Sequence, residues 1–161
     1  MEPARGVCSA CGRLALEETL KAAQGVCMSC VREATDKTLT ELHDALCRKF
    51  GDLYLSNPLL LPRNKNTAYR DRALCISLGV AQALDEMSLA TVSLVTRYRE
   101  KPEHFYLSDM DLKESGQMFM RANFRQWLAK TDRWKPESRT TDRFKKSLSE
   151  DFKAFQKTLS A

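Results

Sequence analysis

Four cysteines near the N-terminus are the residues of this chain whose spacing best defines a chemistry. Cys8 and Cys11 form one Cys-x2-Cys pair, Cys27 and Cys30 form a second, and fifteen residues separate the two pairs. Pairs at this distance are typical of a zinc site, because each turn brings two thiolates to one ion and four thiolates complete a tetrahedron. Since thiolates then fill every position, we expect one structural Zn²⁺ per chain and no open position for a substrate.

The residues around these pairs resemble a known type of module. Gly12 directly follows the first pair, and Gly25 stands shortly before the second. Residues 7–33 resemble a four-cysteine zinc finger of the treble-clef type, in which the second pair opens a helix. A similar finger occurs in the DksA-type regulators that bind bacterial RNA polymerase; those carry a long helical hairpin before the finger, whereas here the finger comes first. The resemblance implies a metal-stabilised folding or docking unit.

The remaining candidates for chemistry are few. Cys47 and Cys75 fall on apolar-facing stretches, as small core residues do. His43 and Cys47 stand four apart on one helix face, a spacing that metals accept, but two ligands alone do not make a site. The sequence has no Gly-rich phosphate loop, no His-Glu-x2-His pattern and no recognisable nucleophile motif. We therefore expect a protein that is not an enzyme.

Positive charge is concentrated in the last quarter of the chain. Residues 121–161 hold 11 Lys and Arg against 5 Asp and Glu, whereas residues 1–120 hold 15 against 16. Basic side chains around an aromatic ring suit a phosphate backbone and an unstacked base. The side chains predicted to contact nucleic acid are Arg121, Arg125, Lys130, Arg133, Trp134, Lys135, Arg139, Arg143 and Lys146. A solvated helix face, or a surface that docks a protein, is the alternative.

The elements that must position these residues are expected to be mainly helical. Apolar periodicity predicts helices over 28–49, over 67–99, after a capping pair at Ser108 and Asp111, and at the C-terminus, with an irregular connector over 52–66. The last helix carries an apolar stripe of Phe144, Leu148, Phe152, Phe155 and Leu159. The fold class is thus mainly α. A four-cysteine zinc module over 1–35 precedes a helical domain over 36–161, a bundle of about four helices with a basic C-terminal quarter.

The sequence also allows a prediction of where in the cell the protein is located. Its first residues lead into a cysteine without an apolar stretch, so no secretory signal is expected. The longest mainly apolar run, residues 73–84, is about half of what a bilayer requires. We expect an intracellular protein, cytoplasmic or nuclear, that is not secreted and has no membrane partner. In a reducing compartment, paired cysteines are more often metal ligands than disulfides.

Three functional hypotheses follow from these patterns. The first is a non-enzymatic regulator that contacts nucleic acid or the transcription machinery, or another nucleic-acid-associated protein complex, through the basic quarter. The second is a protein-interaction adaptor, of viral or mobile-element origin, with no nucleic-acid role. The third is a thiol redox switch that loses zinc reversibly under oxidation. The sequence favours the first.

Overall fold

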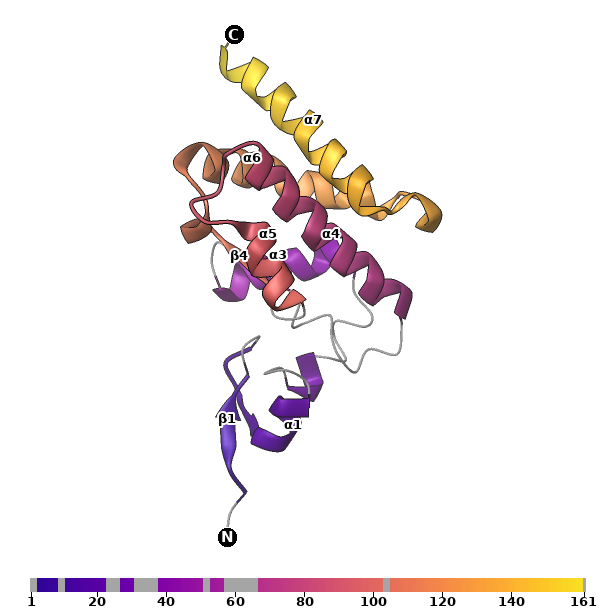
Figure 1. The fold of residues 1–161 in the computed structure, drawn as a ribbon. Coiled ribbons are helices and arrows are strands. Elements are labelled where there is room, and N and C mark those ends of the chain that lie inside the picture. The colour runs from indigo at the N-terminus through magenta and orange to yellow at the C-terminus, as the bar shows by residue number, and fades with distance from the viewer. Residues whose placement is uncertain are drawn as a thin grey trace.

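The computed structural model of this chain describes residues 3–8, 11–22, 27–30, 38–50, 53–56, 67–102 and 105–160. It is mainly helical, which confirms the predicted fold class. The helices are α1 (Glu17–Ala22), α3 (Leu39–Phe50), α4 (Thr67–Glu86), α5 (Leu94–Glu100), α6 (Glu114–Asp132) and α7 (Thr141–Ser160). Short strands form two antiparallel pairs, β1 (Arg5–Val7) with β2 (Leu14–Leu16) and β3 (Leu53–Ser56) with β4 (Tyr106–Ser108). In Figure 1, β1 and α1 lie at one end of the molecule and α7 reaches the other.

Helix α4 packs along α7, as Figure 1 shows. Gly79 allows this close approach, because a Cβ atom there would lie only 2.8 Å from the Cβ of Phe144. Large side chains from α6, α7 and the segment before β4 fill the core, and these are Phe105, Phe119, Phe124, Trp127 and Phe144. None of the helices in the described ranges is long and apolar enough to cross a membrane.

The apolar stripe predicted for the last helix is confirmed over most of its length. Phe144, Leu148 and Phe152 are buried, and Phe155 packs against the same core. Leu159 differs, since 60% of it is exposed. The core contacts of α7 therefore end before its last turn.

The predicted helix from Thr67 to Arg99 is wrong in one respect, because the chain turns between α4 and α5. Ser88 has a φ of 57°, and the N–H of Leu89 donates to the carbonyl of Leu84 at 3.0 Å, which closes the end of α4. The carboxylate of Asp85 then accepts the N–H groups of Leu94 and Val95 at 3.0 and 2.9 Å. An acidic side chain in the last turn of α4 thus caps the start of α5, and hydrophobic periodicity does not detect such a cap.

Two further predictions need correction. The connector expected over 52–66 begins with strand β3, which pairs with β4 from a segment about fifty residues later, and Leu55 and Leu107 are opposite each other and buried. The capping pair is present, with the N–H of Ser108 donating to the Asp111 carboxylate at 3.1 Å. It closes the short 3₁₀ helix Asp109–Asp111, and α6 begins only at residue 114.

The expected first helix and the domain boundary fall partly outside the described residues. Residues 28–30 are helical and α3 begins at Leu39. The stretch between them, 31–37, is outside the description. The division into residues 1–35 and 36–161 therefore stays a prediction.

Removing the cap at the junction of α4 and α5 tests this account of the break. We expect Asp85→Ala to lower the free energy of unfolding by about 1–2 kcal/mol, because two backbone N–H groups lose their acceptor. Glu86→Ala is the matched control, since that carboxylate is 60% exposed and pairs with Lys145 at the surface; its effect should stay within about 0.5 kcal/mol. Urea unfolding measures both. Equal losses of unfolding free energy in the two variants would contradict the assignment of the α5 cap to Asp85.

Candidate metal centre

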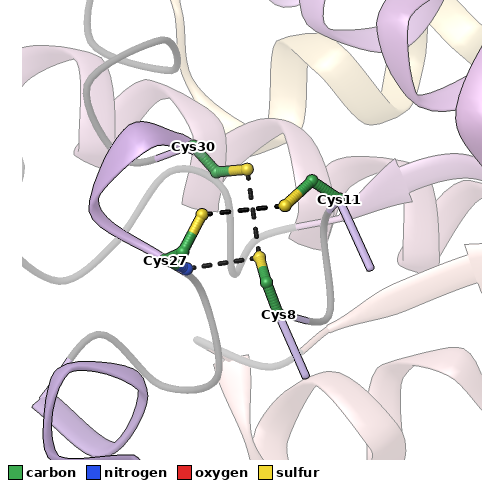
Figure 2. A group of neighbouring side chains, drawn as sticks. All are labelled: Cys8, Cys11, Cys27 and Cys30. Carbon is green, nitrogen blue, oxygen red and sulfur yellow. Dashed lines mark hydrogen bonds between the residues drawn. The ribbon is translucent and has the colours of Figure 1, made fainter. Parts of the chain in front are cut away.

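The four cysteines of the predicted metal site come together in the folded chain. Their Sγ atoms all lie within 4.8 Å of one another, and Figure 2 shows the side chains pointing toward a common centre. Cys8, Cys27 and Cys30 are buried, and Cys11 is half-buried. No second group of three or more His, Cys, Asp or Glu side chains is placed to hold a metal ion within the ranges that the structure covers. The predicted clustering is confirmed.

The sulfur separations fit a tetrahedral ion. Cys8 Sγ lies 3.9 Å from Cys30 Sγ, and Cys11 Sγ lies 3.7 Å from Cys27 Sγ. Metal–sulfur bonds of about 2.3 Å place the corners of a tetrahedron about 3.8 Å apart. A disulfide would require about 2.05 Å between the two sulfurs. The donors therefore stand where four thiolates around one ion would stand, and they are too far apart to be disulfides.

The first pair is held by the turn between β1 and β2. The N–H of Gly12 donates to the carbonyl of Cys8 at 2.9 Å, and the N–H of Cys8 donates to the carbonyl of Arg13 at 2.8 Å. Gly12 has a φ of 73°, a conformation that glycine adopts without steric cost. With these bonds in place, the sulfurs of Cys8 and Cys11 lie within 4.8 Å of each other.

The second pair approaches from a helical segment. Residues 28–30 are helical, so Cys27 stands directly before the first turn and Cys30 within it. The backbone N–H of Cys27 donates to the Sγ of Cys8 at 3.2 Å, a contact drawn in Figure 2. Such a bond stabilises a thiolate, because it directs a positive dipole at the sulfur. A hairpin turn followed by a pair at a helix start matches the arrangement implied by the treble-clef resemblance.

The thiols of the cluster could all ionise only around a cation. Burial raises the pKa of the Cys30 thiol far above its ordinary value, and the neighbouring sulfurs of Cys27 and Cys8 raise it further. Burial also raises the pKa of Cys11. Four thiols this close cannot all ionise unless a positive charge is placed among them. Soft thiolate donors in tetrahedral geometry select zinc or iron rather than magnesium or calcium. The residues present therefore fit a tetrahedral thiolate-bound metal ion.

The residues predicted to contact nucleic acid lie on α6, in the following loop and on the first turns of α7, and the structure divides them by their partners. Three of the nine pair with carboxylates from other segments: Arg121 with Asp109, Arg125 with Asp44, and Lys130 with Asp151. A fourth, Arg139, donates to the backbone carbonyl of Asp132 at 3.0 Å. Four of the nine residues are therefore already paired with a carboxylate or bonded to the backbone.

Of the other members, Arg133 and Lys135 adjoin Trp134 in the sequence, and Arg143 lies over its ring. This ring is half-buried; it stacks on Phe144 with centroids 5.2 Å apart, and the guanidinium of Arg143 lies 4.2 Å from its centroid. Arg133, Lys135 and Lys146 are exposed and form no ion pair in the part of the chain that the structure describes. Their contact with nucleic acid stays a prediction, now confined to a smaller surface.

Sequence reasoning missed the surroundings of His43 and Cys47. The spacing of these two residues was visible, and the structure places Cys47 Sγ 3.4 Å from His43 Nε2. Their other neighbours, among them Tyr54 and Arg125, come from β3 and α6. No local sequence pattern predicts that these side chains lie together, because their segments are brought together only by the tertiary fold.

Comparison with known proteins finds no family model, curated protein or solved structure that matches this chain.

Replacing one ligand tests the metal centre. We expect the purified chain to bind about one equivalent of metal and Cys27→Ser to lose it, together with order in the β1–β2 hairpin and α1. A structural zinc site supplies roughly 10 kcal/mol or more of folding free energy, so three ligands should not hold so small a module. Elemental analysis and hydrogen exchange over residues 5–22 measure the two losses. Cys75→Ser, a half-buried cysteine outside the cluster, is the matched control and should retain the metal.

Proposed function

We propose that this chain is a non-enzymatic regulatory protein that holds one structural zinc ion and contacts nucleic acid, or a protein complex bound to nucleic acid, through a basic surface before and on α7. The observation that carries the proposal is the Trp134 ring with the Arg143 guanidinium over it, together with nearby exposed cations of the same segment that form no ion pair among the described residues. We call this set the Trp134 surface, and it consists of Arg133, Trp134, Lys135, Arg143 and Lys146.

The choice of zinc rests on the donor set. Four thiolates in tetrahedral positions fill the coordination sphere of Zn²⁺ and leave no place for water or substrate. A closed site of this kind supports folding of the module and supplies no catalysis. This is also why the proposal is a binding protein rather than an enzyme.

Ion pairing with carboxylates determines which of the predicted cations are available to bind phosphate. A guanidinium that already holds a carboxylate, as Arg121 and Arg125 do, gains less from a phosphate, since it must first give up its partner. Arg133, Lys135 and Lys146 carry no such partner among the residues described. Each phosphate that they contact would release a condensed counterion, and this release drives most non-specific binding to nucleic acid.

Trp134 gives the surface an aromatic component. Arg143 covers part of the indole, and cation–π contacts of this kind are weak at exposed sites. A base that stacks on the ring would replace Arg143 and leave its guanidinium beside the phosphate of the same nucleotide. The surface therefore suits single strands better than duplex, because duplex bases present no exposed face.

A specific observation also favours protein docking, the second hypothesis. The β1–β2 hairpin exposes apolar side chains: Val7 at 62%, Leu14 at 66% and Leu16 at 43%. Val7 and Leu14 are directly opposite each other in the register. Apolar residues that share one exposed face of a metal-stabilised hairpin are typical of a contact with another protein.

Removing the unpaired cations tests the proposal. We expect replacement of Arg133, Lys135, Arg143 and Lys146 by Ala to weaken binding to all single-stranded sequences alike. For each phosphate that the variant no longer neutralises, the slope of log affinity against log salt should flatten by about 0.7. Fluorescence anisotropy with labelled oligonucleotides from about 50 to 200 mM salt gives this slope. Replacing the carboxylate-paired Arg121, Arg125 and Lys130 is the control, and should change the slope less.

A separate variant distinguishes the protein-docking hypothesis from the nucleic-acid proposal. Replacing Val7 and Leu14 by Ser should leave the metal in place and the oligonucleotide slope unchanged, because neither side chain is a metal ligand or a cation. The wild-type chain should meanwhile bind single strands at about 50 mM salt, where phosphate contacts are strong. Absence of any such binding would contradict the nucleic-acid proposal. Loss of a co-purifying protein from the Val7 and Leu14 variant would then support the adaptor.

A further inference from the structure

A pocket of about 340 Å³ opens between α3, β3 and α6, away from the metal centre and the Trp134 surface. Its lining brings together groups whose chemistry the proposed function does not use: His43, Asp44 and Cys47 from α3, Tyr54 from β3, and Arg121 and Arg125 from α6. Cys47 is half-buried and so can be reached through the pocket, and it forms no disulfide.

The imidazole of His43 is held between Cys47 and Asp44. Its Nε2 lies 3.4 Å from Cys47 Sγ, and its Nδ1 lies 3.6 Å from Asp44 Oδ1. The side chain of His43 is only 9% exposed, and its ring packs edge-on against Phe124 with centroids 5.4 Å apart. Nδ1 is buried and makes no hydrogen bond with any described residue. The ring is thus fixed in orientation and faces the pocket.

The neighbouring carboxylate selects the tautomer of this ring. Asp44 repels a lone pair on Nδ1 and attracts a proton there, so the neutral ring carries its hydrogen on Nδ1. Arg125, which donates to Asp44 at 2.9 Å, lowers the pKa of that carboxyl and keeps it charged. Burial lowers the pKa of His43, which keeps the ring neutral near pH 7. Nε2 then presents its lone pair to the thiol of Cys47.

A thiol beside an oriented base is the arrangement of an activated nucleophile. Cys47 Sγ also lies 3.3 Å from the carbonyl of Leu53; that oxygen can accept the S–H hydrogen bond but cannot take the proton. The imidazole can take it when the sulfur attacks. Two donors do not hold a metal ion, and among the described residues only the four-cysteine cluster offers three. A covalent role suits the pair better than a metal site.

The rim of the pocket selects the charge of the reagent. The side chains of Arg121 and Arg125 are 54% and 68% exposed, whereas their partners Asp109 and Asp44 are only 16% and 30% exposed. The cations therefore face solvent and the carboxylates lie behind them. Both arginines are paired, but the residues that line the pocket include two arginines and a single carboxylate, that of Asp44. The lining therefore keeps a net positive charge, and this favours an anion.

We propose that Cys47 is a modification site that forms a mixed disulfide with a small anionic disulfide, such as glutathione disulfide. The sulfur of Cys47 attacks one sulfur of the reagent as its proton passes to His43 Nε2, and the reagent's S–S bond breaks. The departing thiolate takes up that proton as a thiol. Cys47 and one half of the reagent end as a disulfide; Cys47 is oxidised, the departing half is reduced to a thiol, and the reagent itself is therefore the oxidant.

The experiment uses the full metal-loaded chain and follows each cysteine by peptide mapping after reaction with glutathione disulfide. Cys47 should be modified about tenfold or more faster than Cys75, the half-buried cysteine of α4, because no histidine among the described residues is paired with Cys75. His43→Gln should remove most of this difference. Modification of the two cysteines at equal rates in the wild-type chain would overturn the proposal.

A second variant keeps the test decisive if His43→Gln does not fold. Arg125 is largely exposed, so Arg125→Gln should fold and should slow glutathione disulfide more than cystamine, a cationic disulfide of similar reactivity. Arg99→Gln, an equal change of charge on the exposed surface of α5, is the matched control and should leave the ratio of the two rates unchanged. An unchanged ratio in Arg125→Gln would overturn the anionic preference and with it the proposed reagent.

Discussion

Asp132, the last residue of α6, makes polar contacts that join α6 to α3, to α4 and to the loop before α7. Its carboxylate pairs with Arg72 of α4 and accepts hydrogen bonds from the N–H and hydroxyl of Thr40, at 3.3 and 2.6 Å, in the first turn of α3. Its backbone carbonyl accepts from Arg139 in the loop before α7. The carboxylate is 13% exposed and Arg72 only 10%. A buried charge left without its partner is costly, so these segments must meet in one arrangement.

Both of the surfaces proposed to be functional, the Trp134 surface and the pocket beside Cys47, depend on that arrangement. Helix α3 carries His43 and Cys47, and α6 carries the arginines of the pocket rim, so the contact of Asp132 with Thr40 holds the two sides of the pocket together. The contact with Arg139 fixes the loop from which Arg133 and Lys135 extend. The N-terminal module, over its described residues, has no comparable network and few buried apolar side chains, among them Leu20. There the cysteine cluster, once it holds a metal, takes the place of a core.

The sequence was informative where a feature depends on neighbours along the chain. The spacing of Cys8, Cys11, Cys27 and Cys30 is a local property, and so is the apolar stripe of α7; the clustering was predicted and confirmed, and so was most of the stripe. The break at Asp85 was missed because the carboxylate acts on N–H groups nine and ten residues away, across a turn. The pairing of β3 with β4 was missed because its partners are about fifty residues apart. Charge counts found the basic quarter, but only tertiary contacts show which of its cations already hold a carboxylate.

A divalent ion bound in the cysteine cluster, as proposed, would also change how the chain behaves in an electric field. The formal charge of +5 counts all cysteines as neutral, whereas a divalent ion on four thiolates carries two net negative charges. The loaded chain therefore has a net charge of about +3, with its most acidic group at the N-terminal end and its basic excess at the other. Loss of the metal lets the sulfurs take up protons, since burial raises the pKa of Cys30 and Cys11. A stripped sample would then migrate as a more cationic species and be retained more strongly on a polyanionic resin, whatever the native surface binds.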